Sequence, residues 1–382
     1  VVLSLLSFRR ATHSLTMPNL GSGFANARFQ QTMLRIKDPK LSVPFYCENF
    51  GMTLIHWIRF DQWGFTVYFL ERKREGQASP ECTMEKTSVE CEKYLNTMDG
   101  TTIELTHNHG SEDKEDFKVW NGNTGKDAGE GPNFAEEPAA RGFGHIAFNC
   151  DDVNEACEKL EANGVKFQKK PDEGRMKGLA FALDPDGYWI EIVRRDKVGW
   201  PEYYNLSQTM MRVKDGPASI DFYEKNLGMR LLRHMNMPQY GFSLIFMCSC
   251  SDEELQTAID LLPAEEKEVI KADGFVDPAK PNSLTKVLWN SCLELTWNHG
   301  TEKDADFKVH DGNAQPQGFG HIGFLVDDLD GSCTKMEENG VIFKKKPQDG
   351  NMRGIAFVYD PNGYWIELID RQATFAGTCS NY

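Results

Sequence analysis

The stretch GFGHIAF at residues 142–148 returns as GFGHIGF at residues 318–324, and this repeat points to a duplicated fold. Three further blocks recur in the same order. They are QTMLRIKD (31–38) with QTMMRVKD (208–215), IELTHNHG (103–110) with LELTWNHG (293–300), and GRMKGLAFALDPDGYWIEIV (174–193) with GNMRGIAFVYDPNGYWIELI (350–369). His145 and His321 are 176 residues apart, and so are Glu191 and Glu367. The chain therefore carries two copies of one unit.

Each half divides again into two similar quarters. In the first quarter, residues 33–37 predict a strand, residues 42–52 a short helix, and residues 53–58, 65–71 and 102–106 three further strands. The second quarter repeats this order with strands at 145–149, 165–170, 178–184 and 188–193 and a helix at 151–165, for which Asp151 or Asp152 is the expected N-cap. We therefore predict an α+β fold of four βαβββ modules in two tandem domains.

The domain boundaries follow from breaks in the repeat. We expect an N-terminal extension (1–23), a first domain (24–197), a second domain (203–371) and a C-terminal tail (372–382), with the join near KVGWPEYY at 197–204. The second half also gains residues before its ELT block. This extra stretch, near 252–274, is charged and predicts helix, as expected of a tolerated surface insertion.

Composition excludes several classes of protein. The 382-residue chain has a net charge of −15, which argues against a nucleic-acid partner. It has no run of 18 apolar residues, so no membrane span is expected, and the predicted location is the cytoplasm. Residues 1–23 contain two arginines and no acid; they are either part of a mitochondrial or plastid transit peptide or upstream sequence outside the fold.

Four polar residue types stand out on the predicted strands of both halves. Strand alternation places Glu191 on one face with Trp189 and Val193, and His145 on one face with Phe143 and Ala147. Each residue alone is commonly solvated or packed in a core. Together, however, one Gln, one Glu, one His and one Glu recur in order, as Gln31, Glu104, His145 and Glu191 and as Gln208, Glu294, His321 and Glu367. Such oxygen-rich sets with one imidazole can hold a divalent cation and leave coordination positions open.

GFGHIG also matches the dinucleotide-binding pattern GxGxxG, but we reject that interpretation. The pattern requires a strand before the glycines and a helix after them. Here a polar loop (NAQPQ) precedes the glycines and a predicted strand (HIGFLV) follows them.

These blocks resemble the glyoxalase I (lactoylglutathione lyase) family of the vicinal-oxygen-chelate superfamily, in its fused, double-length form. The resemblance covers roughly residues 28–195 and 205–370. It implies metal sites shared between the halves, one from Gln31, Glu104, His321 and Glu367 and the other from Gln208, Glu294, His145 and Glu191. Zn²⁺ is the expected metal, with Ni²⁺ and Co²⁺ as alternatives. A monomer with both sites between its halves is the expected state.

The family reaction is isomerisation of the hemithioacetal of methylglyoxal and glutathione to S-lactoylglutathione, with glutathione as co-substrate. The resemblance implies that a Glu moves the proton between neighbouring carbons while the metal stabilises the enediolate. Glu191 and Glu367 are the expected principal bases, with Glu104 and Glu294 assisting.

The resemblance also implies a set of glutathione contacts. They are Arg35, Asn108, Arg212, Asn298, Arg141, Lys169, Arg175, Met176, Lys345 and Met352. In the second half, Gln317 replaces Arg141 and Asn351 replaces Arg175. We therefore expect weaker glutathione binding at the site with His321 and Glu367.

Two other functions share this fold. A non-haem iron dioxygenase needs two His and one carboxylate, but Gln31 and Gln208 stand where that pattern would need His. A metal-free binding protein would not need four ligands in both halves. Both are therefore less consistent with the residues than a metal-dependent isomerase.

Overall fold

The structure is a computed structural model of the chain, and it describes residues 27–123, 141–174, 176–195, 200–267, 280, 282–375 and 377–381. The predicted N-terminal extension (1–23) and Arg175 lie outside these ranges, so what was expected of them stays a prediction. Among the described residues, no helix has both the length and the apolar character needed to cross a membrane.

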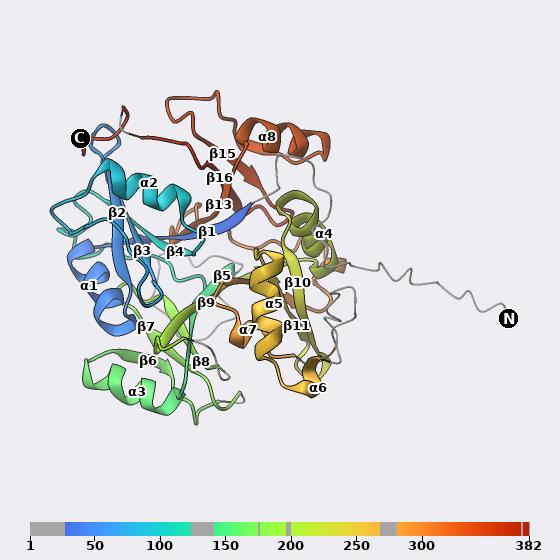
Figure 1. Ribbon diagram of the computed structural model, residues 1–382. Coiled ribbons are helices and arrows are strands. Elements are labelled where there is room, and N and C mark those ends of the chain that lie inside the picture. Colours follow the sequence, from blue (N-terminus) through green and yellow to red (C-terminus); the bar gives the residue numbers. More distant parts are fainter. Residues whose placement is uncertain are drawn as a thin grey trace.

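Each quarter of the chain folds as one module of strands around a helix (Figure 1). The first contains β1 (Arg28–Ile36), α1 (Pro39–Phe50), β2 (Thr53–Phe60), η2 (Asp61–Trp63), β3 (Phe65–Glu71), α2 (Val89–Thr97) and β4 (Thr102–Asn108). The second contains β5 (Phe143–Cys150), α3 (Val153–Ala162), β6 (Lys166–Lys169), β7 (Ala180–Leu183) and β8 (Trp189–Arg194). The third contains β9 (Tyr204–Val213), α4 (Gly216–Leu227), β10 (Arg230–Met237), η3 (Pro238–Tyr240), β11 (Phe242–Cys248), α5 (Asp252–Leu261), α6 (Ala264–Lys267), α7 (Leu284–Val287), β12 (Cys292–Asn298) and η4 (Thr301–Lys303). The fourth contains β13 (Phe319–Val326), α8 (Leu329–Glu338), β14 (Phe343–Lys345), β15 (Ile355–Tyr359) and β16 (Trp365–Asp370).

The four module helices begin in the same way. Before α1, α3, α4 and α8 stand Asp38, Asp152, Asp215 and Asp328, and each carboxylate accepts a backbone N–H of the first helical turn. An Asp N-cap satisfies amides that a helix start leaves without partners. The predicted α+β fold of four βαβββ modules is confirmed, and the described part of the charged insertion, up to Lys267, contains α5 and α6.

The sixteen strands of the described residues form two eight-stranded sheets, and each sheet takes strands from both halves of the chain. One has the order β14-β15-β16-β13-β1-β4-β3-β2, so the first module lies beside the fourth. The other has the order β10-β11-β12-β9-β5-β8-β7-β6, so the second module lies beside the third. The two modules of each sheet meet along antiparallel pairs, β1 with β13 and β5 with β9. Every sheet therefore needs both copies of the repeat.

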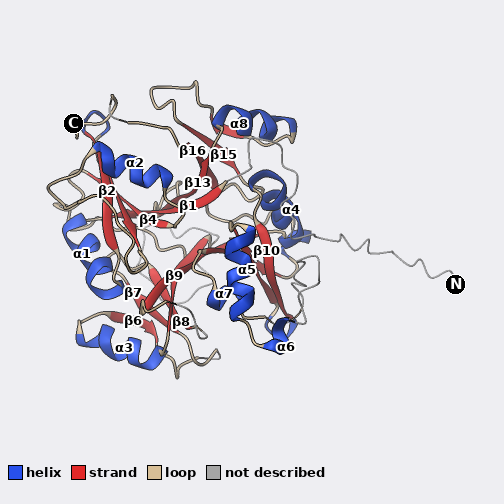
Figure 2. Cartoon of the chain, in the orientation of Figure 1, coloured by secondary structure: helices blue, strands red, loops and turns tan. Residues whose placement is uncertain are grey.

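The main hydrophobic core joins the two sheets and the helices around them. Phe143 on β5 stacks on Phe319 on β13 with ring centroids 5.1 Å apart, and Phe50 of α1 stacks on Phe148 of β5 at 4.3 Å. Figure 2 shows the helices toward the outside of the molecule, with the strands between them. Smaller apolar clusters lie outside this core, one of them built from Ile58, Phe60, Val67 and Phe69 on β2 and β3.

Candidate functional site

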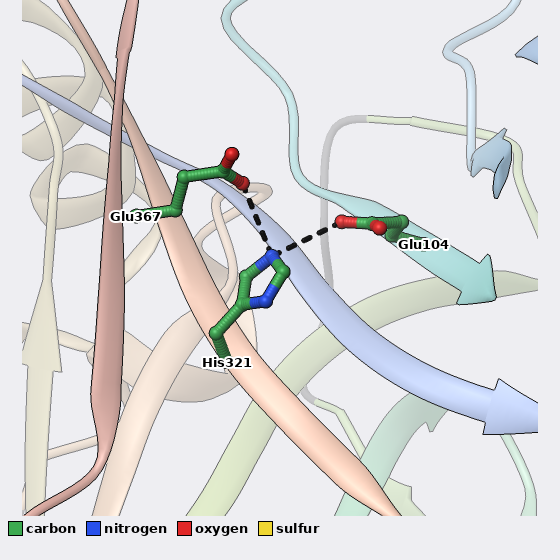
Figure 3. Close-up of side chains that lie close together, drawn as sticks. All are labelled: Glu104, His321 and Glu367. Atoms are coloured by element: carbon green, nitrogen blue, oxygen red, sulfur yellow. Dashed lines mark ion pairs between the residues drawn. The ribbon is translucent and has the colours of Figure 1, made fainter. Parts of the chain in front are cut away.

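The sheet of the first and fourth modules carries one cluster of buried polar side chains, which we call the Glu104 site: Gln31, Glu104, His321 and Glu367. His321 Nε2 lies 3.2 Å from Glu104 Oε2 and 3.1 Å from Glu367 Oε2. Figure 3 shows the two carboxylates pointing at the same imidazole nitrogen. Gln31 Nε2 donates to both carboxylates, at 2.5 Å to Glu104 and 2.8 Å to Glu367. Residues from both halves of the chain thus converge on one point.

The sheet of the second and third modules carries the matching cluster, the Glu294 site: Gln208, Glu294, His145 and Glu191. His145 Nε2 lies 3.3 Å from Glu191 Oε2 and 3.4 Å from Glu294 Oε2. Gln208 Nε2 donates to Glu191 at 2.9 Å and to Glu294 at 2.6 Å. The eight residues expected as ligands are all buried, and the structure brings them together in the two predicted sets of four.

Strand alternation explains how an apolar sheet presents these polar groups. On β8, Tyr188 just before the strand, Ile190 and Ile192 are fully buried in the main core, so Glu191 lies on the opposite face. On β1, Leu34 and Ile36 face the core, whereas Gln31, Met33 and Arg35 line the cavity beside the Glu104 site. The predicted face of Glu191 on β8 agrees with the structure.

On β5, however, the prediction that Phe143 shares a face with His145 is wrong. The pairing with β9 contains an irregularity here, because Phe143 is opposite Met211 and His145 is opposite Met210. The extra residue on β5 is Gly144, and a bulge of this kind turns the chain so that strict alternation fails. Phe143 consequently packs in the core and His145 enters the site.

Burial and neighbouring charge oppose one another at both histidines. Burial lowers the pKa of His321, but Glu104 and Glu367 outweigh it and raise the pKa to about 9. Burial also lowers the pKa of His145, and Glu191 with Glu294 again raises it to about 9. Burial raises the pKa of the Glu367 and Glu294 carboxyls, an effect that the paired histidines reduce. Each cluster therefore concentrates acids that a cation would stabilise in ionised form.

The donor atoms of both clusters fit a divalent cation. One ligand atom each from Glu104, His321 and Glu367 lies within 4.8 Å of the others, and the same holds for His145, Glu191 and Glu294. His145 Nε2 is buried between the Glu191 and Glu294 carboxylates, at 3.3 and 3.4 Å. One imidazole nitrogen and several oxygens suit Zn²⁺, Ni²⁺ or Co²⁺. Rotating the Gln31 amide by about half a turn would add its carbonyl oxygen.

Comparison with known proteins agrees with this geometry. Residues 28–192 and 205–368 each match the Glyoxalase/Bleomycin resistance protein/Dioxygenase superfamily. The chain is 38% identical to glyoxalase I of Saccharomyces cerevisiae over 88% of this chain and 90% of the relative. It is 37% identical to lactoylglutathione lyase of Schizosaccharomyces pombe, over 90% and 97% of the two chains. The chain belongs to the glyoxalase I family.

The crystal structure of glyoxalase I from Zea mays matches the whole architecture. It aligns with 90% of this chain and 92% of its own, with 26% identity and a TM-score of 0.58. The curated relatives are enzymes, and this chain is an enzyme of the same family. Its fold has two domains and two eight-stranded sheets.

Of the contacts expected from the glyoxalase I family, Arg35, Asn108 and Met352 line the cavity beside the Glu104 site. Arg35 on β1 donates to the backbone carbonyls of Gly318 and Phe319, each at 3.2 Å. Arg212 on β9 does the same to Gly142 and Phe143. Burial and, to a smaller extent, the nearby Arg141 lower the pKa of Arg212 to about 10. The two arginines therefore brace the glycine-rich entry to the opposite His strand.

The remaining expected contacts differ in exposure. Asn108 and Arg141 are exposed and Asn298 is half-buried. Lys169 Nζ donates to the Leu179 carbonyl at 2.6 Å, and Lys345 Nζ donates to the carbonyl of Met352 at 2.7 Å and of Ile355 at 2.8 Å.

Sequence reasoning missed the apolar wall beside the Glu104 site. A cavity of about 340 Å³ reaches from Glu104, His321 and Glu367 to the aromatic and aliphatic residues of β2 and β3. These are Ile58, Phe60, Phe65, Val67 and Phe69, with Phe375 from the segment after β16. The sequence signal was present in the alternation of β2 and β3, but alternation alone does not separate a core face from a cavity face.

Proposed function

We propose that this chain isomerises the hemithioacetal of methylglyoxal and glutathione to S-lactoylglutathione at both clusters, as part of methylglyoxal detoxification. The observation that carries the proposal is the twofold convergence of buried Gln, Glu, His and Glu from both halves. The names of the fungal relatives, glyoxalase I and lactoylglutathione lyase, support the substrate assignment.

Four residues would hold the metal at each site: Gln31, Glu104, His321 and Glu367 at one, and Gln208, Glu294, His145 and Glu191 at the other. The metal, when bound, would supply Lewis-acid stabilisation of negative charge that develops on the substrate oxygens.

The chain's own carboxylates would move the proton. We assign Glu367 at the Glu104 site and Glu191 at the Glu294 site as principal bases, with Glu104 and Glu294 assisting. Each base takes the proton from the carbon that bears sulfur and returns it to the neighbouring carbon, so no proton is lost. The raised pKa of Glu367, which burial causes, makes its carboxylate a better proton acceptor.

The cations around each site would bind the glutathione carboxylates. Arg212, Arg141 and Lys169 serve the Glu294 site in this proposal, together with Asn298, Met176 and Arg175, and Arg175 lies outside the described residues. Arg35, Asn108, Lys345 and Met352 serve the Glu104 site. Because one chain supplies all four residues of each cluster, we propose that a monomer is sufficient for activity.

Chelation and metal replacement test the proposal. We expect a chelator to abolish glutathione-dependent isomerase activity of the purified chain, and Zn²⁺, Ni²⁺ or Co²⁺ to restore it. Replacing Glu191 and Glu367 together by Gln should lower kcat about a hundredfold or more, because both proton carriers are lost. The control is Glu112→Gln, which removes a carboxylate that pairs with His107 and belongs to neither site. It should leave kcat unchanged. A chain that stays inert with all three metals would contradict the proposal.

A further inference from the structure

The segment after β16 crosses the open edge of the sheet that carries the Glu104 site. β2 is the last strand of that sheet, and Ser380 N donates to the Arg59 carbonyl on β2 at 2.7 Å. Asn381 completes the contact, since its Oδ1 accepts from Arg59 N and its Nδ2 donates to the Trp57 carbonyl, both at 2.6 Å. Figure 1 shows this end of the chain beside β2 and α2. The segment thus occupies a sheet edge that would otherwise be unpaired.

Helix α2 holds the same segment further upstream. The buried carboxylate of Glu92 accepts the backbone N–H of Phe375 at 2.5 Å, and Asn96 Nδ2 donates to the Ala373 carbonyl at 2.8 Å. The segment is therefore held by α2 at residues 373–375 and by β2 at residues 380–381, and these contacts fix the position of Phe375.

Phe375 lines the cavity that contains Glu104, His321 and Glu367. Its ring lies edge-on to Phe60, with centroids 6.3 Å apart, and it packs near Met352. Small-molecule sites commonly measure about 300–1,000 Å³. A cavity of about 340 Å³ is near the lower end of that range, so one aromatic wall limits what the cavity can accept.

The second half provides an internal comparison. Ile58, Phe60 and Val67 are buried, whereas their repeat partners on β10 and β11, Met235, Met237 and Leu244, are half-exposed. Met352 is likewise half-buried near Phe375, and its partner Met176 is 39% exposed. The apolar side chains of β10 and β11, in the sheet of the Glu294 site, are thus more exposed than those of β2 and β3, in the sheet of the Glu104 site.

We propose that Phe375 is a specificity-determining residue of the Glu104 site. It closes the apolar end of the cavity, so this site prefers glutathione conjugates with a small substituent, while the Glu294 site also accepts bulky ones. The inference rests on the proposed function, because that function supplies the class of ligand, glutathione conjugates.

Binding of two glutathione thioethers to the metal-loaded chain tests this without turnover. The probes are S-methylglutathione and S-benzylglutathione, measured by calorimetry on the full chain and on Phe375→Ala, Phe375→Trp and Gln372→Ala. We expect Phe375→Ala to favour the benzyl over the methyl compound by about fivefold or more at one of the two sites, because space opens there. Phe375→Trp should shift the ratio the other way. Gln372 is exposed in the same segment, so its replacement should leave the ratio unchanged.

Kinetics then assign the change to a site. In a Glu191→Gln background, where the Glu104 site remains intact, Phe375→Ala should raise the relative kcat/KM for the phenylglyoxal over the methylglyoxal hemithioacetal. In a Glu367→Gln background it should not. An unchanged binding ratio, a shift at both sites or failure of both thioethers to bind would overturn the inference. If the unaltered metal-loaded chain shows no isomerase activity, the proposed function is refuted. A shifted ratio of benzyl to methyl binding would still support the role of Phe375 in that case.

Discussion

The glycines before each histidine have different neighbours. A Cβ on Gly318 would overlap the backbone carbonyl of Trp120, and one on Gly142 would overlap that of His310. A Cβ on Gly144 or Gly320 would instead meet the sulfur of Met210 or Met33. Backbone cannot move aside without displacing a strand, whereas the end of a methionine side chain can. In each GFGH repeat, the first glycine is therefore required by a neighbouring backbone, whereas the second is required only by a methionine side chain that can move.

This difference predicts a ranking of two alanine substitutions. Gly318→Ala should lower the free energy of unfolding by about 3 kcal/mol, because it forces backbone apart, and Gly320→Ala by less than about 1.5 kcal/mol. Urea denaturation monitored by circular dichroism would measure both. Equal losses, or a larger loss for Gly320→Ala, would contradict the argument.

The two histidines predict a pH dependence of metal binding. Each has a pKa of about 9 without metal, so Nε2 carries a proton at neutral pH that a cation must displace. Raising the pH removes this competitor, so affinity should increase about tenfold per pH unit from pH 6.5 toward 9 and then level off. Competition with a chelating dye at fixed ionic strength would measure it. Affinity that is constant over this range would show that neither His needs to lose a proton.

At the scale of elements, one local signal recurs in every module. The capped start of each helix sits directly after the first strand, so Asp38, Asp152, Asp215 and Asp328 mark the turn from strand to helix. The first strand carries Gln31, His145, Gln208 or His321. The cap therefore stabilises the helix that follows each site strand.

Removing one cap should have a local cost. Asp152 Oδ1 accepts from Asn154 N at 2.8 Å and Glu155 N at 3.1 Å, so Asp152→Ala should lower the free energy of unfolding by about 1 kcal/mol. Glu158→Ala, an exposed change on the same helix, should cost less than about 0.5 kcal/mol. Thermal unfolding of both variants would compare them; the same loss in each would mean that the cap contributes nothing specific.

At the scale of the whole molecule, the two copies of the repeat have diverged around equivalent clusters of Gln, Glu, His and Glu. Gln317, in place of Arg141, donates to the Asn313 carbonyl at 2.9 Å and brings no charge. Asn351, in place of Arg175, is exposed. The Glu104 site thus lacks two positive charges that the sequence provides for the Glu294 site, Arg141 and Arg175, and these charges would attract an anionic glutathione conjugate.

This divergence predicts unequal Michaelis constants. Glu191→Gln leaves the Glu104 site intact, and its KM should exceed that of Glu367→Gln by about threefold to thirtyfold, since each exposed ion pair is worth up to about 1 kcal/mol. Steady-state kinetics of the two variants would measure it. As a control, adding Gln317→Arg to Glu191→Gln should lower KM again. Indistinguishable KM values would refute the expected inequality.

Much of the fold could be predicted because it depends on local patterns. The repeat, a helix cap at Asp151 or Asp152 and the face of β8 follow from residue spacing, since alternation and capping act over a few residues. The bulge at Gly144 could not be predicted, because a glycine in a strand does not reveal which neighbour it must avoid. The place of Phe375 at the cavity beside the Glu104 site was missed for a similar reason: nothing local ties residue 375 to strands β2 and β3.

The sequence by itself determined the duplicated α+β modules and the four residue types that recur in each half. Resemblance to a family implied that the two halves share their sites. Only the tertiary structure decided which modules lie side by side, which atoms converge at about 3 Å and which site the segment around Phe375 covers. These features depend on contacts between residues far apart in the chain, such as Gln31 with Glu367, and such contacts are set by packing instead of local spacing.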